Sequence, residues 1–302
     1  MSPMVSSRRL FIPQRGMILV IVLWIVTLLA VMAGSFAYSM RTEIRLALGA
    51  VERARARALA EAGVAYAMAW QLDHDASRKT WPPNGDPREW VFGDGRVRIE
   101  VINANGLVSL NTASPDLLKA LFSGVGVDAA DRDALVEAVL NWSESGQQQM
   151  LGRPDRAAGQ LSGRFQPRKA RFESIEELQQ VEGMTKAIYE RIADEVTAFS
   201  SHLGVNPEFA PAGLLRDLGL DERAVADYVA SRAKAAADGS RPPPVPRTSG
   251  EGIFFGGRTP IYHITVAAEL ESGTVVKVKA VTDLQAGIIA QDLRVFAWRE
   301  GR

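Results

Sequence analysis

The side chains that most often carry chemistry are few in this sequence, and they form no catalytic pattern. The 302 residues include three histidines, His74, His202 and His263, and no cysteine. The lack of cysteine excludes a disulfide framework, a thiolate metal site and a cysteine nucleophile. Asp73-His74-Asp75 ends a helical pattern, and a histidine near the negative end of a helix dipole explains it. Because no nucleophile-elbow, zinc-protease or phosphate-loop motif occurs either, we expect no catalytic residues and no enzyme.

A glycine-centred bend at Glu182 has the pattern of a helix-hairpin-helix unit. DNA-binding versions of this unit present backbone N–H groups to a phosphate, and lysine or arginine side chains add affinity. In ELQQVEGMTKAIYERI, however, the bend carries Glu182, and acidic residues around it outnumber Lys186 and Arg191. The formal net charge of the chain is zero, which gives no bulk attraction to nucleic acid. We therefore interpret the hairpin as a packing or protein-contact unit and expect no nucleic acid partner.

Calcium is the one metal whose binding the side chains do not exclude. Hard cations need several oxygen ligands. Residues 141–159 offer Asn141, Ser143, Glu144 and Asp155, which are mostly neutral and spread out. The alternating aspartates of a typical calcium loop occur nowhere in the sequence. We therefore predict no metal ligands and no cofactor, with calcium as the only candidate.

An uncharged segment over residues 17–38 predicts a transmembrane helix. As a helix, it would span about 33 Å, enough for a hydrocarbon core of about 30 Å. Tyr38 falls near its far edge, where an aromatic ring with a polar tip is favoured. A cleaved secretory signal fits less well, because the apolar run is long and no small-x-small site ends it. A plain signal anchor stays open, and arginines on both sides leave the orientation undecided.

Residues 40–72 continue the helical pattern beyond the membrane. They contain no proline and many alanine, arginine, glutamate and leucine residues, which favour helices. We expect one long helix whose inner face packs against a sheet. The helical spacing predicts the following contact stripe: Leu59, Ala62, Tyr66, Ala69 and Leu72.

The strands of that sheet are predicted from alternation near both ends of the remaining chain. Residues 96–104 alternate as RVRIEVINA, and residues 107–111 follow a tight turn as a short return strand. Residues 260–284 form a hairpin pattern, and residues 293–298 offer a last strand. An antiparallel sheet with one apolar face needs a cover, and the long helix supplies it.

Three helix–bend–helix units lie between these strands and resemble weak internal repeats. They cover residues 111–142, 174–197 and 210–232. Ser114-Pro115 gives the first unit a typical helix start, and Ser174 with Glu177 fits a capping box in the second. Loop-like composition covers residues 73–95, 143–171 and 240–252. The order of elements predicts an α+β fold with a helical insertion between strands.

The amino-terminal sequence resembles a known family. QRGMILVIVLWIVTLLAVMAGSFAYSMRTEIR is similar to the class III leader of bacterial type IV pilins and type II secretion pseudopilins. The resemblance implies cleavage between Gly16 and Met17 by a prepilin peptidase on the cytoplasmic face, and methylation of the new amino group of Met17. It also implies a single-pass protein of the inner membrane whose carboxyl-terminal domain lies in the periplasm.

More narrowly, the whole chain resembles the large minor pseudopilins of type II secretion, the general secretion pathway protein K family. VINANGLVSLNTA and FESIEELQQVEGMTKAIYERIADEVT are similar to two of its segments. The resemblance implies a pilin-like long helix packed on an antiparallel sheet, with a large inserted helical domain of helix-hairpin-helix or SAM-like type. Where the family carries acidic motifs, this chain has Asn103-Ala104 and Asn141–Glu144, and Gly204–Ala210 also departs from the family pattern. The first two segments replace carboxylates with neutral groups, which puts the family's calcium binding in doubt here.

Ile21, the fifth residue after the implied cleavage point, stands where most pilins have glutamate. In a filament, that carboxylate is thought to offset the amino group of a neighbouring subunit in an apolar bundle, where an unpaired charge is expensive. The large minor pseudopilin lacks it, and so does this chain. The resemblance therefore predicts a subunit that caps the periplasmic pseudopilus and helps initiate its assembly. Its expected partners are the other minor pseudopilins, the major pseudopilin, the prepilin peptidase and inner membrane lipid.

These expectations divide the chain into seven segments. They are a leader (1–16), a transmembrane helix (17–39), its extension (40–72), a pilin-like α/β domain in two pieces (73–111 and 253–302), an inserted helical domain (112–240) and a proline-rich linker (241–252). Two alternative functions remain, a minor pilin of a type IV pilus and a membrane-anchored helix-hairpin-helix DNA-binding protein. The acidic bend and the carboxyl-terminal strands disfavour the second of these.

Overall fold

The computed structural model describes residues 15–72, 81–93, 95–150, 171–241, 243–244, 252–286 and 291–301. Residues 1–14 of the predicted leader, the triplet Asp73-His74-Asp75 and most of the proline-rich linker lie outside the described residues. The chain divides into two compact units between Arg55 and Ala56, and each unit is described separately.

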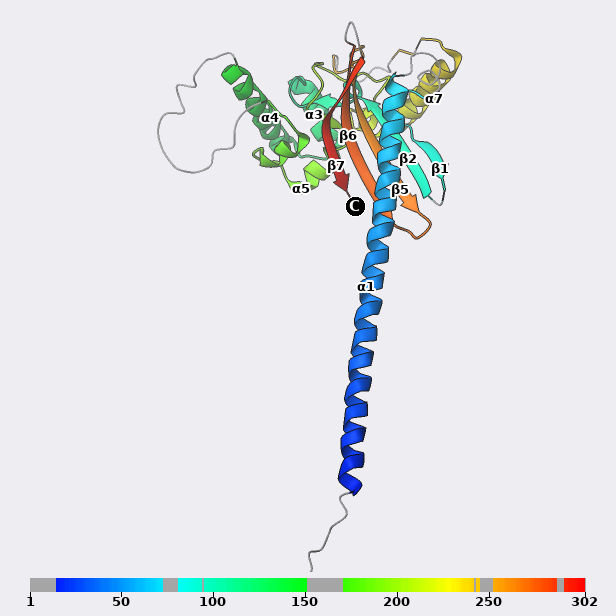
Figure 1. The fold of residues 1–302 in the computed structure, drawn as a ribbon. Coiled ribbons are helices and arrows are strands. Elements are labelled where there is room, and N and C mark those ends of the chain that lie inside the picture. Colours follow the sequence, from blue (N-terminus) through cyan, green and yellow to red (C-terminus); the bar gives the residue numbers. More distant parts are fainter. Residues whose placement is uncertain are drawn as a thin grey trace, which may run out of the picture. The chain divides into compact units, whose positions relative to one another are not determined.

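The first unit is the amino-terminal part of a single helix, α1 (Arg15–Leu72), drawn in blue in Figure 1. The helix runs for 58 residues without a break. It contains no proline and is rich in alanine and leucine, which explains its continuity. The predicted continuation of the membrane segment into a longer helix is therefore confirmed.

The second unit is built on a five-stranded antiparallel sheet in the order β1-β2-β5-β6-β7 (Figure 1). Its strands are β1 (Arg88–Phe92), β2 (Gly95–Asn103), β5 (Ile261–Leu270), β6 (Val275–Ala286) and β7 (Gln291–Gly301). β2 pairs with β5, although the helical elements lie between them in sequence. The predicted α+β fold with a helical insertion is confirmed.

The carboxyl-terminal part of α1 covers one face of this sheet. Alternation puts Ile99, Val266 and Val278 on the same face in cross-strand register. These side chains are buried against α1. The buried residues that α1 contributes to this core are Ala56, Ala60, Val64, Ala67 and Trp70.

The contact stripe that helical spacing predicts is not the one in the structure. Leu59 is only partly buried, and the rest of that stripe is exposed, namely Ala62, Tyr66, Ala69 and Leu72. The contact face includes several small residues such as Ala60 and Gly63, with Val64 and Trp70 beside them. A Cβ atom on Gly63 would lie 2.7 Å from Cγ1 of Val266, so the helix backbone runs close to the sheet. Large side chains would prevent this approach, so they flank the contact.

The inserted elements form the three predicted helix–bend–helix units. Glycines with positive φ, Gly126, Gly183 and Gly219, lie in the three bends. One expectation was wrong: α4 extends to Met150, into a segment expected to be loop, and residues 151–170 lie outside the described residues. The elements are α3 (Pro115–Gly124), α4 (Ala129–Met150), the 3-10 helix η2 (Ile175–Gln180), α5 (Lys186–Ile192), α6 (Ala212–Asp217) and α7 (Glu222–Asp238).

The helix starts follow the predicted local chemistry. Ser114 Oγ accepts a hydrogen bond from the backbone N–H of Leu117 at 3.2 Å, and Pro115 lies in the first turn of α3. Glu177 Oε1 accepts from the backbone N–H of Ser174 at 3.1 Å, as a capping box requires. These interactions satisfy N–H groups that a helix start leaves without intrahelical partners.

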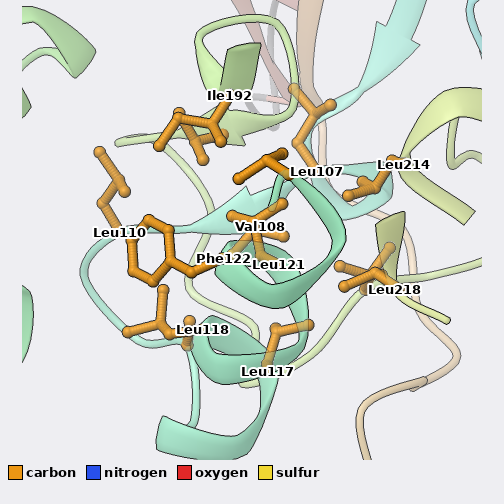
Figure 2. Packing of buried hydrophobic residues seen from close by; sticks show 14 of the residues in the cluster. Leu107, Val108, Leu110, Leu117, Leu118, Leu121, Phe122, Ile192, Leu214 and Leu218 are labelled. Carbon is orange, nitrogen blue, oxygen red and sulfur yellow. The ribbon is translucent and has the colours of Figure 1, made fainter. Parts of the chain in front are cut away.

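A second hydrophobic core holds the inserted elements together, and Figure 2 shows part of it. Leucines of α3 meet Ile192 of α5 and leucines of α6 in this core. β3 (Val108–Ser109) crosses it and pairs in parallel with β4 (Val196–Thr197). The prediction that residues 107–111 return beside the preceding strand is therefore wrong. The 3-10 helix η1 (Ala104–Gly106) turns the chain out of the large sheet first.

The inserted domain rests on the sheet face opposite α1. Cross-strand register puts His263, Lys279 and Arg299 on that face. Thr197 Oγ1 and His263 Nε2 are hydrogen-bonded at 2.9 Å, and burial lowers the pKa of His263 to about 4. Two ion pairs continue the contact, Lys279 with Asp194 and Arg299 with Glu176. The histidine is thus a neutral packing group.

A carboxyl pair lies beside this contact. Burial, a hydrogen bond to Asp217 and repulsion from Asp217 and Asp194 raise the pKa of Glu195 to about 8. The folded chain therefore keeps a proton on Glu195 at a pH where the unfolded chain loses it. The stability that this proton contributes is complete below pH 4.5 and is lost as the pH rises toward 8.

Gly63→Ala should destabilise the protein, because its new methyl group meets Val266 in close contact. We expect a loss of about 1–3 kcal/mol in the free energy of unfolding. Gly49→Ala is the matched control, because a Cβ atom there has no other atom within 4 Å. Circular dichroism of the detergent-solubilised chain during thermal unfolding would measure both. Equal effects of the two substitutions would contradict the proposed close approach.

Glu195→Gln should flatten the pH dependence of stability. The amide imitates the protonated carboxyl, so wild type and variant should have similar melting temperatures at pH 5, and the variant should melt higher at pH 8. Glu269→Gln, at an exposed position, serves as the control. A difference between Glu195→Gln and wild type that does not grow from pH 5 to pH 8 would argue against the raised pKa.

Candidate functional site

The amino-terminal part of α1 is a candidate membrane anchor. Among the described residues, α1 is the one helix that is long and apolar enough to cross a bilayer, and its candidate membrane span begins at Met17. Its large apolar side chains are exposed throughout the uncharged segment. Thr27 Oγ1 donates to the carbonyl of Leu23 at 2.7 Å, so the helix itself satisfies this hydroxyl. This pattern suits a lipid environment, where polar groups must be satisfied internally.

The predicted processing and assembly residues lie together at the start of this anchor. Gly16, Met17 and Ile21 fall within the first two turns of α1, and no acidic residue occurs in its first turn. Met17 and Ile21 are four residues apart and therefore share a helix face. They are 58% and 53% exposed. The side chain of Ile21 is apolar, so this surface offers no carboxylate there to a neighbouring amino group.

A second candidate region is the junction where the inserted domain leaves the sheet. Asn103 Oδ1 accepts from the backbone N–H of Asn105 at 3.2 Å, and its Nδ2 donates to the carbonyl of Thr259 at 2.7 Å. Asn206 Nδ2 donates to the carbonyl of Gly257 at 2.7 Å. The backbone N–H of Asn206 also donates to the carbonyl of Asn105 at 2.6 Å. Residues 103–104 and 204–210, which both depart from the family pattern, thus meet at this junction.

The donors at this junction identify it as a structural contact. Both asparagines, Asn103 and Asn206, use an amide N–H that a carboxylate lacks. Asn141 lies on the exposed side of α4, and the side chain of Glu144 lies outside the described part of the chain. No group of three or more histidine, aspartate or glutamate residues that could hold a metal ion occurs among the described residues.

Arg232 is a buried residue that the sequence reasoning missed. Its Nη1 donates to the carbonyls of Pro207 at 2.8 Å and Ala210 at 2.6 Å. Burial lowers its pKa, and the side chain fixes the 207–210 segment beneath α7. The spacing of Val225, Tyr228 and Arg232 could have revealed it, because i, i+3 and i+7 lie on one helix face.

The two described histidines, His202 and His263, lie in separate contacts and do not form a site together. His263 packs between the inserted domain and the sheet, and His202 lies beside Gly257 at the edge of the junction. His74 lies outside the described residues.

The architecture is that of a membrane-anchored, pilin-like α+β protein with an inserted helical domain. The family model described as "Type II secretion system (T2SS), protein K" matches residues 100–201, from β2 through β4. Over these residues the chain matches the protein K family, a family of minor pseudopilins of type II secretion. The family is a structural component of the secretion system.

Solved structures agree with this assignment at the level of the fold. A structure described as the GspK-GspI-GspJ complex from the enterotoxigenic Escherichia coli type 2 secretion system matches with a TM-score of 0.51 and 16% sequence identity. The match covers 87% of this chain and 99% of the other. No curated protein matches this sequence. The predicted family and pilin-like fold are thus confirmed.

Asn103→Asp should weaken the junction. The substitution replaces an N–H donor by a carboxylate oxygen that faces the carbonyl of Thr259. We expect the free energy of unfolding to fall by about 1–3 kcal/mol. The measurement is urea unfolding, with and without millimolar calcium.

The control is Gln180→Glu, which adds the same charge at an exposed position and should change stability little. Recovery of Asn103→Asp by calcium would show instead that this junction is a latent metal site.

Proposed function

We propose that this minor pseudopilin caps the tip of the periplasmic pseudopilus and helps initiate its assembly for the export of folded proteins. The observation that carries the proposal is the apolar start of α1. Ile21 replaces the usual glutamate, and no acidic residue lies in the first turn. The proposal assigns the chain a structural role and no catalytic one.

The physical argument concerns the amino group that processing creates. Cleavage after Gly16 would leave a charged amino group on Met17 inside an apolar helical bundle, where an unpaired charge is costly. A subunit with a carboxylate at the fifth position can offset the amino group of the subunit ahead of it. A subunit with Ile21 cannot, and this deficit is harmless only where no subunit lies ahead. The tip is such a position.

The position of the inserted domain supports the same conclusion. It packs on the sheet face opposite α1, through His263, Lys279 and Arg299. The insertion therefore adds bulk on the face of the sheet that α1 does not cover. A bulky domain is easier to accommodate at the end of a filament than within a regular helical array.

The proposed partners and membrane location follow from this role. The partners are the other minor pseudopilins, as in the GspK-GspI-GspJ complex of the similar structure, together with the major pseudopilin. Prepilin peptidase acts between Gly16 and Met17, inner membrane lipid surrounds residues 17–38, and the sheet-containing unit lies in the periplasm. We also propose that the junction is maintained by Asn103 and Asn206 without calcium.

Ile21→Glu should disturb the formation of the tip complex or the secretion of exported proteins. The new carboxylate would let the subunit offset an amino group ahead of it, so its preference for the end would be lost. Co-purification with the other minor pseudopilins and release of a secreted protein are the two measurements. Unchanged behaviour in both assays would refute the charge argument.

Two controls make this test specific. Ile21→Leu keeps the apolar surface and should behave as wild type, and both variants should remain in the membrane fraction after alkaline extraction. Mass spectrometry of the extracted protein should find Met17 as the first residue. A chain that still carries its first sixteen residues would contradict the proposed processing.

A further inference from the structure

Two bends of the inserted domain lie side by side and line a groove of about 870 Å³. The first bend, residues 125–128, joins α3 to α4, and the second, residues 182–185, precedes α5. The two bends contain the positive-φ residues Gly126 and Gly183. A Cβ atom on Gly183 would lie 3.7 Å from Leu135 Cδ1, so the second bend contacts α4 closely. We call this hollow the acidic groove.

The groove combines an apolar floor with an acidic rim. The floor contains apolar side chains, and the rim carries four carboxylates. Among the described residues, none of the four forms an ion pair. The floor residues are Val125, Val127, Leu135, Ala138 and Ile188, and the carboxylates are those of Asp128, Asp131, Glu137 and Glu182.

The cation at this surface can offset at most one of the four carboxylates of the rim. Arg191 is the basic residue that lines the groove among the described residues, and its Nη1 donates to the carbonyl of Val125 at 2.6 Å. The groove therefore presents uncompensated negative charge above apolar surface.

This arrangement reverses the chemistry of phosphate-binding hairpins. Both bends carry an acid, Asp128 in the first and Glu182 in the second, so an anionic ligand would be repelled. The carboxylates also do not converge, because no metal-binding group of three occurs among the described residues. The chemistry that fits is an extended cation whose stem covers the apolar floor while its charge reaches the rim, as lysine and arginine do.

We propose that the acidic groove is a docking site for a protein partner that presents a segment with two or more lysine or arginine residues next to apolar side chains. Charge complementarity selects the partner and accelerates its association, and the apolar floor supplies contact area. The inference does not depend on the position of the chain in the pseudopilus.

The test uses the full chain in a non-ionic detergent and a fluorescein-labelled ten-residue peptide of alternating lysine and leucine. Fluorescence anisotropy at low salt and at 0.15 M salt measures the Kd. Asp131→Asn/Glu137→Gln/Glu182→Gln should raise the Kd by about tenfold or more. The matched control Glu89→Gln/Glu269→Gln/Glu271→Gln removes three exposed carboxylates on the sheet and should leave the Kd unchanged.

Several outcomes would overturn the proposal. These are no binding by the wild-type chain, equal weakening in both triple variants, and equal binding of a peptide with glutamate in place of lysine. Displacement of the peptide by millimolar calcium would indicate a metal site instead. A wild-type dimer in sedimentation that the groove variant dissociates would indicate a second copy as the occupant.

The same variants separate this proposal from the tip proposal. Unchanged co-purification and secretion in Ile21→Glu, with peptide binding equal to wild type, would count only against the tip position. Loss of peptide binding in the groove variant with intact co-purification is the result expected here.

Discussion

The packing of a small-residue face of α1 against the sheet is the contact on which the rest of the protein depends. Ala56, Ala60, Gly63 and Ala67 bring the helix backbone close enough to bury the apolar faces of β2, β5 and β6. Because α1 is a single helix, this contact also connects the anchor to the folded unit. The opposite face of the sheet is then available for the inserted domain.

The inserted domain stays in place through polar contacts at its two borders. At one border, Asn103 and Asn206 hold the loop at 257–259 with amide donors. At the other, Lys279 of the sheet pairs with Asp194 of the inserted domain, beside the half-buried His263. Asn103 and Asn206 are buried, and buried polar groups are costly unless they are paired, so their contacts specify one arrangement of domain and sheet.

The missing carboxylate at the start of α1 and the carboxylates of the acidic groove suggest separate roles for the two units. The membrane-spanning part of α1 lacks the carboxylate that would join it to a subunit ahead, which suits an end position. The acidic groove has carboxylates without ion-pair partners among the described residues, which suits a basic partner.

The sequence alone determined the long helix, most strands, the helix–bend–helix units and the family, because these depend on local periodicity and short motifs. It predicted roles for Gly16, Met17 and Ile21 through the leader pattern. Tertiary structure decided which face of α1 packs, because backbone approach at Gly63 outweighs side-chain size. It also decided that residues 108–109 pair with β4, that Arg232 is buried, and that two acidic bends form one groove. Local patterns cannot determine such long-range contacts, since each depends on residues far apart in the chain that meet only after folding.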